Sequence, residues 1–149
     1  MAFNILVVDD SETMRAVIKK TVAMSGVQIG EIREAGNGKE ALLVLEDAWM
    51  DVVLSDINMP EMGGVEFLRE VKQDEVLRNI PVIFVTTESS QARIDEVTSL
   101  GAAGYIKKPF MPEKIRTILL DVLNKAYASR MAEEGHGLAS VAASSEEDF

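Results

Sequence analysis

Four short, nearly continuous apolar runs occur along the chain, at residues 5–8, 52–54, 82–85 and 105–106. Runs of this length without polar alternation are typical of strands covered on both faces, as in a parallel sheet between two layers of helices. A weaker candidate strand lies at residues 29–34, where apolar and polar residues mix. The pattern therefore predicts five strands.

Between these runs, apolar residues recur at the spacing of amphipathic helices. Polar caps, glycines and one proline mark where the helices begin and end. Five strands thus alternate with five helices, as in successive right-handed β-α-β units. The predicted helix starts are Ser11, Asn37 with Glu40 as a capping box, Gly63 and Gly64, Ser89 and Pro112, and the predicted stops include Gly26 and Gly101.

This alternation predicts one doubly wound α/β domain over residues 1–127. Periodicity does not fix the strand order, so another three-layer α/β fold with a different order stays open. Residues 128–149 are rich in Ala, Ser, Gly and Glu, which predicts a flexible acidic tail, with a lengthened last helix as the alternative. His136 lies there between two glycines and is assigned no role.

Composition narrows the function classes. A net charge of −10 disfavours nucleic acid as a partner, because phosphate backbones are bound by an excess of Lys and Arg. The chain has no cysteine, which excludes disulfides and thiolate metal sites and suits a reducing compartment. The first residues do not have the pattern of a signal peptide, and no apolar run approaches the length of a membrane span. We therefore expect a cytoplasmic protein without membrane insertion.

Polar residues follow the predicted strands at the edge where a parallel α/β sheet binds its ligands. They are Asp9, Asp10, Asp56, Thr86 and Lys108. Two carboxylates 4–5 Å apart repel each other by roughly 3–4 kcal/mol at an effective dielectric constant near 20. Such a cluster is relieved by a hard divalent cation with oxygen ligands, and Mg²⁺ suits a site with few carboxylates.

A carboxylate beside a cation and a lysine can attack phosphorus and form an acyl phosphate. Positioning and charge neutralisation supply nearly all the catalysis in such a transfer. Lys108 would balance the phosphoryl oxygens, and the Thr86 hydroxyl could donate a hydrogen bond to one of them. The residues alone thus predict phosphoryl transfer to one of these carboxylates.

Four motifs in order, ILVVDDS, DVVLSDINMPEMGG, PVIFVTT and GAAGYIKKPF, carry a resemblance to the receiver domain of two-component response regulators, from residue 3 to about residue 124. The resemblance implies a flavodoxin-like (βα)5 sandwich with a five-stranded parallel sheet of order 2-1-3-4-5. It also implies a phosphoacceptor switch rather than a turnover enzyme, one that promotes its own phosphotransfer and slow autodephosphorylation.

The same resemblance assigns roles at the site. Asp56 would be the phosphoacceptor, and Mg²⁺ would be held by Asp10, Asp56 and the backbone carbonyl of Asn58, with Asp9 acting through a water. Thr86 would sense the phosphoryl group and Lys108 would pair with it. Tyr105 matches the aromatic residue that turns inward as the Thr moves. In the family, the peptide bond after this Lys is typically cis when Pro follows.

The stand-alone chemotaxis receivers are the best match within the family. Asn58 and Glu88, each two positions after a site residue, agree with the pair in those proteins, whereas Thr87 departs from the usual Ala or Gly. The implied partners are a sensor histidine kinase, a flagellar-motor or relay protein as target, and a possible phosphatase. The implied partner surface comprises residues 91–100 and 114–123 with Tyr105 and Lys107, which strand alternation places on the side opposite Lys108.

Three alternatives remain. The first is a receiver that acts as a phosphorelay intermediate. The second is a Mg²⁺-dependent phosphohydrolase with an Asp nucleophile, although such enzymes usually carry a DxD motif after the first strand and a cap domain. The third is a docking module without the chemistry, which would have lost one of Asp10, Asp56, Thr86 and Lys108; all four are present.

Overall fold

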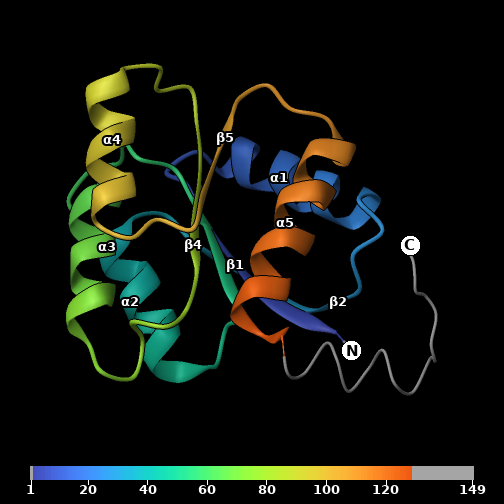
Figure 1. Cartoon of the computed structure of the whole chain (residues 1–149), viewed down its shortest axis with the longest axis horizontal. Coiled ribbons are helices and arrows are strands. Elements are labelled where there is room, and N and C mark those ends of the chain that lie inside the picture. Colours follow the sequence, from blue (N-terminus) through green and yellow to red (C-terminus); the bar gives the residue numbers. More distant parts are fainter. Residues whose placement is uncertain (1, 129–149) are drawn as a thin grey trace.

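The computed structural model describes residues 2–128, which form a single sheet flanked by helices (Figure 1). The five strands all run parallel, in the order β2-β1-β3-β4-β5. The predicted flavodoxin-like (βα)5 topology is therefore confirmed. In chain order the elements are β1 (Phe3–Val8), α1 (Glu12–Met24), β2 (Ile29–Ala35), α2 (Gly38–Asp47), β3 (Val52–Ser55), α3 (Gly64–Gln73), β4 (Val82–Thr86), α4 (Gln91–Ser99), β5 (Gly104–Lys107) and α5 (Pro112–Ala126).

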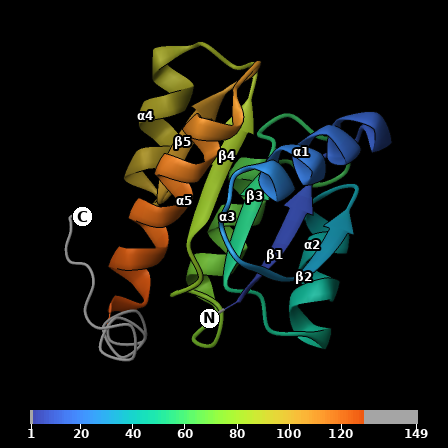
Figure 2. The same cartoon turned by 90° about the vertical axis from the view of Figure 1, so that its right-hand side faces the viewer.

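Helices cover both faces of the sheet. Helices α1 and α5 pack on one face, and α2, α3 and α4 pack on the other (Figure 1 and Figure 2). Strands β3 and β4 are buried along their whole length, as their unbroken apolar runs predicted. Strands β2 and β5 form the two edges, which is why their sequences are more mixed. No helix within residues 2–128 is long and apolar enough to cross a membrane.

Most helix boundaries follow the predicted caps. The Ser11 hydroxyl accepts the Met14 N–H at 3.1 Å, and the Asn37 side chain accepts the Glu40 N–H at 3.0 Å. The Glu40 carboxylate bonds to the Gly36 N–H rather than to the cap residue itself. Gly26 and Gly101 end their helices with φ values of +88° and +103°, which favour glycine.

The predicted cap of the fourth helix is wrong by one residue. Ser90, not Ser89, caps α4, and its hydroxyl accepts the Arg93 N–H at 3.4 Å. The cause lies in the preceding loop, where the Glu88 carboxylate accepts the Ser90 N–H at 3.1 Å. This turn keeps Ser89 outside the helix.

The predicted acidic tail lies almost entirely outside the described residues, which end at residue 128. The last described helix, α5, ends at Ala126 and is capped by the Tyr127 N–H, which donates to Leu123 O at 2.8 Å. The prediction of a domain over residues 1–127 followed by a flexible tail therefore stays a prediction.

Gly64 lets α3 approach the end of β3. A Cβ at this position would lie 2.5 Å from the backbone oxygen of Asp56 and 2.7 Å from Phe84 Cε1. Neither the backbone oxygen nor the buried ring can move aside freely, so an added methyl group would clash with both. We therefore expect Gly64→Ala to lower the free energy of unfolding by about 1–3 kcal/mol, measured by urea denaturation. A Cβ at Gly63 would come no closer than 3.2 Å. Equal losses in Gly64→Ala and Gly63→Ala would contradict this explanation.

Candidate functional site

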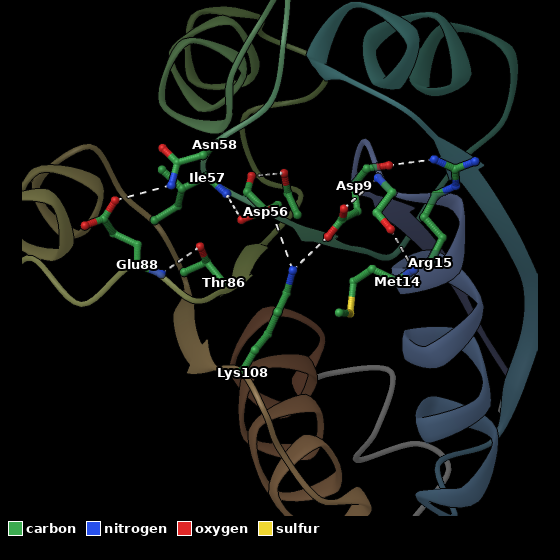
Figure 3. A network of polar contacts seen from close by, with 11 residues as sticks. Asp9, Met14, Arg15, Asp56, Ile57, Asn58, Thr86, Glu88 and Lys108 are labelled. Atoms are coloured by element: carbon green, nitrogen blue, oxygen red, sulfur yellow. Dashed lines mark hydrogen bonds and ion pairs between the residues drawn. The ribbon is translucent and has the colours of Figure 1, made fainter.

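The candidate site lies at the carboxyl ends of the strands, where four of the predicted residues converge, namely Asp9, Asp56, Thr86 and Lys108 (Figure 3). Val8 pairs with Ser55 in the parallel register of β1 and β3, so the residues that follow them, Asp9 and Asp56, leave the sheet side by side. Thr86 ends β4, and Lys108 follows β5 directly. Strand alternation and register thus assemble the site from four separate segments.

Three carboxylates form a cluster at this edge. One oxygen from each of Asp9, Asp10 and Asp56 lies within 4.8 Å of the other two. Asp9 is buried, Asp56 is half-buried and Asp10 is exposed. At this separation each like-charged pair repels by about 1–3 kcal/mol, depending on how much water screens it. Three hard oxygen donors that converge in this way fit Mg²⁺ by their chemistry.

Lys108 partly compensates this negative charge. Its Nζ lies 2.9 Å from Asp9 Oδ2 and 3.5 Å from Asp56 Oδ2, and only 10% of its side chain is exposed. The second oxygen of Asp9 accepts the Ser11 N–H at 2.9 Å. Both oxygens of Asp9 are therefore occupied within the protein. The Lys108–Pro109 peptide bond is cis, in agreement with the expectation from the family.

Asp56 is held in a fixed orientation. Its Oδ1 accepts the Ile57 N–H at 2.7 Å, and its backbone N–H donates to Val8 O at 2.9 Å. Its side chain is 14% exposed, which leaves a narrow approach from solvent. The carboxylate is thus oriented by its backbone neighbour and electrostatically stabilised by Lys108.

A chain of hydrogen bonds leads from the site to Tyr105. The buried Thr86 hydroxyl accepts the Glu88 N–H at 3.1 Å, and the Tyr105 hydroxyl donates to the backbone oxygen of Glu88. Burial, followed by the nearby Glu88 charge, raises the pKa of Tyr105, so the phenol stays protonated and able to donate. Thr86 and Tyr105 are therefore connected through one residue.

Glu88 also contacts the other side of the site. Its carboxylate accepts the Asn58 amide N–H at 3.3 Å. The Ser90 N–H, then the Asn58 amide, lower the pKa of Glu88 and keep it ionised. Asn58 is exposed. The two residues singled out from the sequence are thus in contact.

Arg15 is a site residue that the sequence analysis missed. Its guanidinium donates to the backbone oxygen of Asp9 at 2.6 Å and to Glu34 at 2.9 Å. Lys19 and then Arg15 lower the pKa of Glu34. Arg15 lies one helical turn beyond the cap Ser11, on the same face of α1. This spacing of four residues is the sequence signal that places Arg15 near the end of β1.

The chain is a doubly wound α/β protein, a class that binds ligands at the edge where the strand order reverses. At this edge, separate segments contribute clustered carboxylates, a compensating lysine and a hydroxyl. Residues 5–120 match the response regulator receiver domain, and the chain belongs to that family. Members of this family are signalling switches. The earlier expectation from sequence motifs is therefore confirmed for the family and the fold.

Among relatives, the chain is 38% identical over 131 residues to a chemotaxis protein CheY homolog of Campylobacter jejuni, covering 87% of this chain and 99% of the relative. It is 40% identical over 119 residues to the chemotaxis protein CheY of Pseudomonas aeruginosa, covering 77% and 94%. Among solved structures, it resembles chemotaxis protein CheY4 of Vibrio cholerae with a TM-score of 0.70 and 35% identity, covering 85% and 99%.

Proposed function

We propose that this chain is a single-domain chemotaxis response regulator that a histidine kinase phosphorylates on Asp56. The observation that carries the proposal is the pairing of Lys108 with both Asp9 and Asp56 inside the carboxylate cluster. An aspartate that only follows a strand is usually solvated or caps a helix, and it is not surrounded by a lysine and two further carboxylates. Similarity to CheY proteins over nearly their whole length supports the chemotaxis assignment.

In the proposed transfer, an Asp56 carboxylate oxygen attacks the donor's phosphorus and forms a P–O bond. The bond from phosphorus to the donor's imidazole nitrogen, or to the acetate oxygen of acetyl phosphate, breaks, and its electron pair leaves with the donor. Asp10, Asp56 and the backbone oxygen of Asn58 would hold Mg²⁺, with Asp9 acting through a water. Bound there, Mg²⁺ would neutralise charge on the phosphoryl oxygens.

Lys108 and Thr86 would stabilise the product. Lys108 already faces Asp56 at 3.5 Å and would pair with a phosphoryl oxygen on it. The Thr86 hydroxyl uses its oxygen to accept the Glu88 N–H, so its proton is available to donate to the phosphoryl group. Because Glu88 also holds the Tyr105 hydroxyl, movement of Thr86 would change the position of Tyr105. Phosphorylation would thereby shift the population of two conformers of the partner surface.

A cavity of about 440 Å³ adjoins the proposed partner surface and is lined by Tyr105, Lys107 and Lys114 of that surface and by Pro109, Phe110 and Met111 beside it. It combines two cations with an exposed methionine, which suits an acidic peptide that also carries apolar side chains. A flagellar-motor or relay protein would dock here in the cytoplasm, and a phosphatase would act at the site edge. Spontaneous loss of the phosphoryl group would follow a water path beside Asn58 and Glu88.

The direct test is exposure to acetyl phosphate with Mg²⁺, followed by intact-mass measurement. We expect a mass gain of one phosphoryl group in the wild type, and no gain in Asp56→Asn or without Mg²⁺. A second phosphoryl group, or an equal gain in Asp56→Asn, would contradict the proposal. Sustained hydrolysis of generic phosphate esters, without accumulation of the modified chain, would instead indicate a phosphohydrolase.

Thr87 is expected to slow phosphorylation by small donors. It is exposed and follows Thr86 at the rim of the site, where the family often has a smaller residue. Removing its branched side chain should widen access to Asp56. We therefore expect Thr87→Ala to react several-fold faster with acetyl phosphate, measured by stopped-flow or mass kinetics. Equal rates in the two proteins would show that Thr87 does not limit access.

A further inference from the structure

A second cavity, of about 310 Å³, lies at the end of the sheet opposite the carboxylate cluster. Its walls come from α3, the α3–β4 and α4–β5 connections, and the last turns of α5. The C-terminal end of α5 and the start of the chain lie at this same end of the molecule (Figure 1 and Figure 2). The lining residues include Lys72, Arg78, Pro81, Ala103, Val122 and Lys125.

This cavity, which we call the basic pocket, is cationic in an acidic chain. Its lining contains Lys72, Arg78 and Lys125 but no carboxylate, although the whole chain carries a net charge of −10. Lys125 pairs with Asp121 at 3.2 Å, on the exposed side of α5. Among ion pairs between residues 2–128, none involves Lys72 or Arg78. Two of the three cations therefore lack a counter-charge there.

Lys72 is the most confined of these cations. Its Nζ donates to the backbone oxygen of Arg78 at 3.1 Å, and its stem packs against Gly101, where a Cβ would lie 2.9 Å from Lys72 Cε. Burial lowers the pKa of Lys72, and no nearby carboxylate opposes this effect. A bound anion would stabilise the ammonium group. The lining also includes the apolar residues Pro81, Ala103 and Val122.

We propose that the acidic segment Glu146, Glu147, Asp148 and Phe149 of the same chain docks in the basic pocket. The three consecutive carboxylates complement the cations of the pocket, of which Lys72 and Arg78 have no ion-pair partner within residues 2–128, and the aromatic ring that follows suits the apolar part of the lining. The chain leaves the described structure beside the pocket, because Lys125 and Ala126 form part of its wall. Roughly 20 residues connect this wall to Glu146, so the connecting segment is long enough for the acidic segment to reach the pocket.

Tethering favours this occupant over a separate acidic peptide. A short connecting segment gives the acidic residues an effective concentration near the millimolar range at the pocket, so a weak contact suffices for occupancy. The contact is mainly electrostatic and partly exposed, so salt should weaken it. The pocket also includes Gly101 and Ala103 of the α4–β5 connection, which leads directly into the proposed partner surface.

The test uses a spin label on the full chain. Because the sequence has no cysteine, Ser145→Cys provides a single attachment point next to the acidic segment. We expect the amide NMR signals of Asn79, Gly101 and Ala103 to lose most of their intensity, whereas those of Asn58 and Thr87 at the opposite end stay unchanged. About 1 M NaCl, where the Debye length is about 3 Å, should restore the lost signals.

Charge variants distinguish docking from incidental proximity. Arg78→Glu and the triple variant Glu146→Gln, Glu147→Gln, Asp148→Asn should each abolish the broadening, whereas Lys39→Glu, on the exposed face of α2, should not. Restoration in Arg78→Glu combined with Glu147→Lys would support a direct pairing. No selective broadening, or broadening that survives Arg78→Glu, would overturn the proposal. Broadening only between labelled and isotope-enriched separate chains would assign the pocket to a second copy and also overturn it.

Discussion

Asp10→Asn is expected to make the metal-free protein more stable while it abolishes phosphorylation. Asp10 is the exposed member of a cluster whose oxygens lie within 4.8 Å of one another, so its neutralisation removes repulsion from Asp9 and Asp56. Since water screens Asp10, we expect a gain of about 1–2 kcal/mol in the free energy of unfolding, or about 3–8 °C in Tm. Thermal unfolding in the presence of a chelator measures this gain.

Addition of Mg²⁺ should reverse the ranking of the two proteins. The wild type should gain about 2.7 kcal/mol at a Mg²⁺ concentration of 100 times Kd, because the ion binds only the folded state, whereas Asp10→Asn should gain little. Glu75→Gln removes one exposed negative charge from the α3–β4 connection and serves as the control. A metal-free Asp10→Asn protein no more stable than Glu75→Gln would contradict the picture of repelling carboxylates.

Lys108→Met should have the opposite and larger effect. Lys108 is 10% exposed and lies 2.9 Å from Asp9, whose side chain is 2% exposed. Its removal leaves a buried carboxylate without its cation, which should lower the free energy of unfolding of the metal-free protein by about 3 kcal/mol. Mg²⁺ should recover part of this loss by compensating the same charge. Urea denaturation with and without Mg²⁺ measures both effects.

Lys107→Met is the matched control, because it removes the same charge from the adjacent, exposed residue of β5. It should change stability by less than about 0.5 kcal/mol. Asp9→Asn combined with Lys108→Met should be less destabilised than the sum of the single variants predicts, because the two groups form a pair. Additive losses would show that Lys108 stabilises the fold through packing of its stem rather than through Asp9.

The sequence predicted the fold well because its signals were local and repeated. The apolar runs of β3 and β4 are buried on both faces, and the caps Ser11 and Asn37 bond as expected. The site was predictable for a related reason. Parallel strands direct their carboxyl ends to one edge, so residues that follow strands converge there whatever their separation in sequence. Asp9 and Lys108 are 99 residues apart and form an ion pair.

Two features that the sequence did not predict depend on hydrogen bonds between a side chain and a backbone N–H or C=O group in a loop. The N-cap of α4 is Ser90 rather than the predicted Ser89, because the Glu88 carboxylate accepts the Ser90 N–H. A turn of this kind leaves no periodic pattern in the sequence. Arg15 escaped because its acceptor is the backbone oxygen of Asp9, which a sequence does not place in space. The basic pocket escaped because its cations come from α3, the α3–β4 connection and α5, which are separate in the sequence and meet only in the folded chain.

The most direct test of the central claim locates the phosphoryl group on the chain. Treatment of the phosphorylated protein with borohydride reduces an acyl phosphate to the corresponding alcohol, and peptide mass mapping then identifies the modified residue. We predict homoserine at position 56 alone, only in samples that received both Mg²⁺ and a phosphodonor. Modification at Asp9, at Asp10 or at any residue outside the carboxylate cluster, with Asp56 intact, would contradict the account.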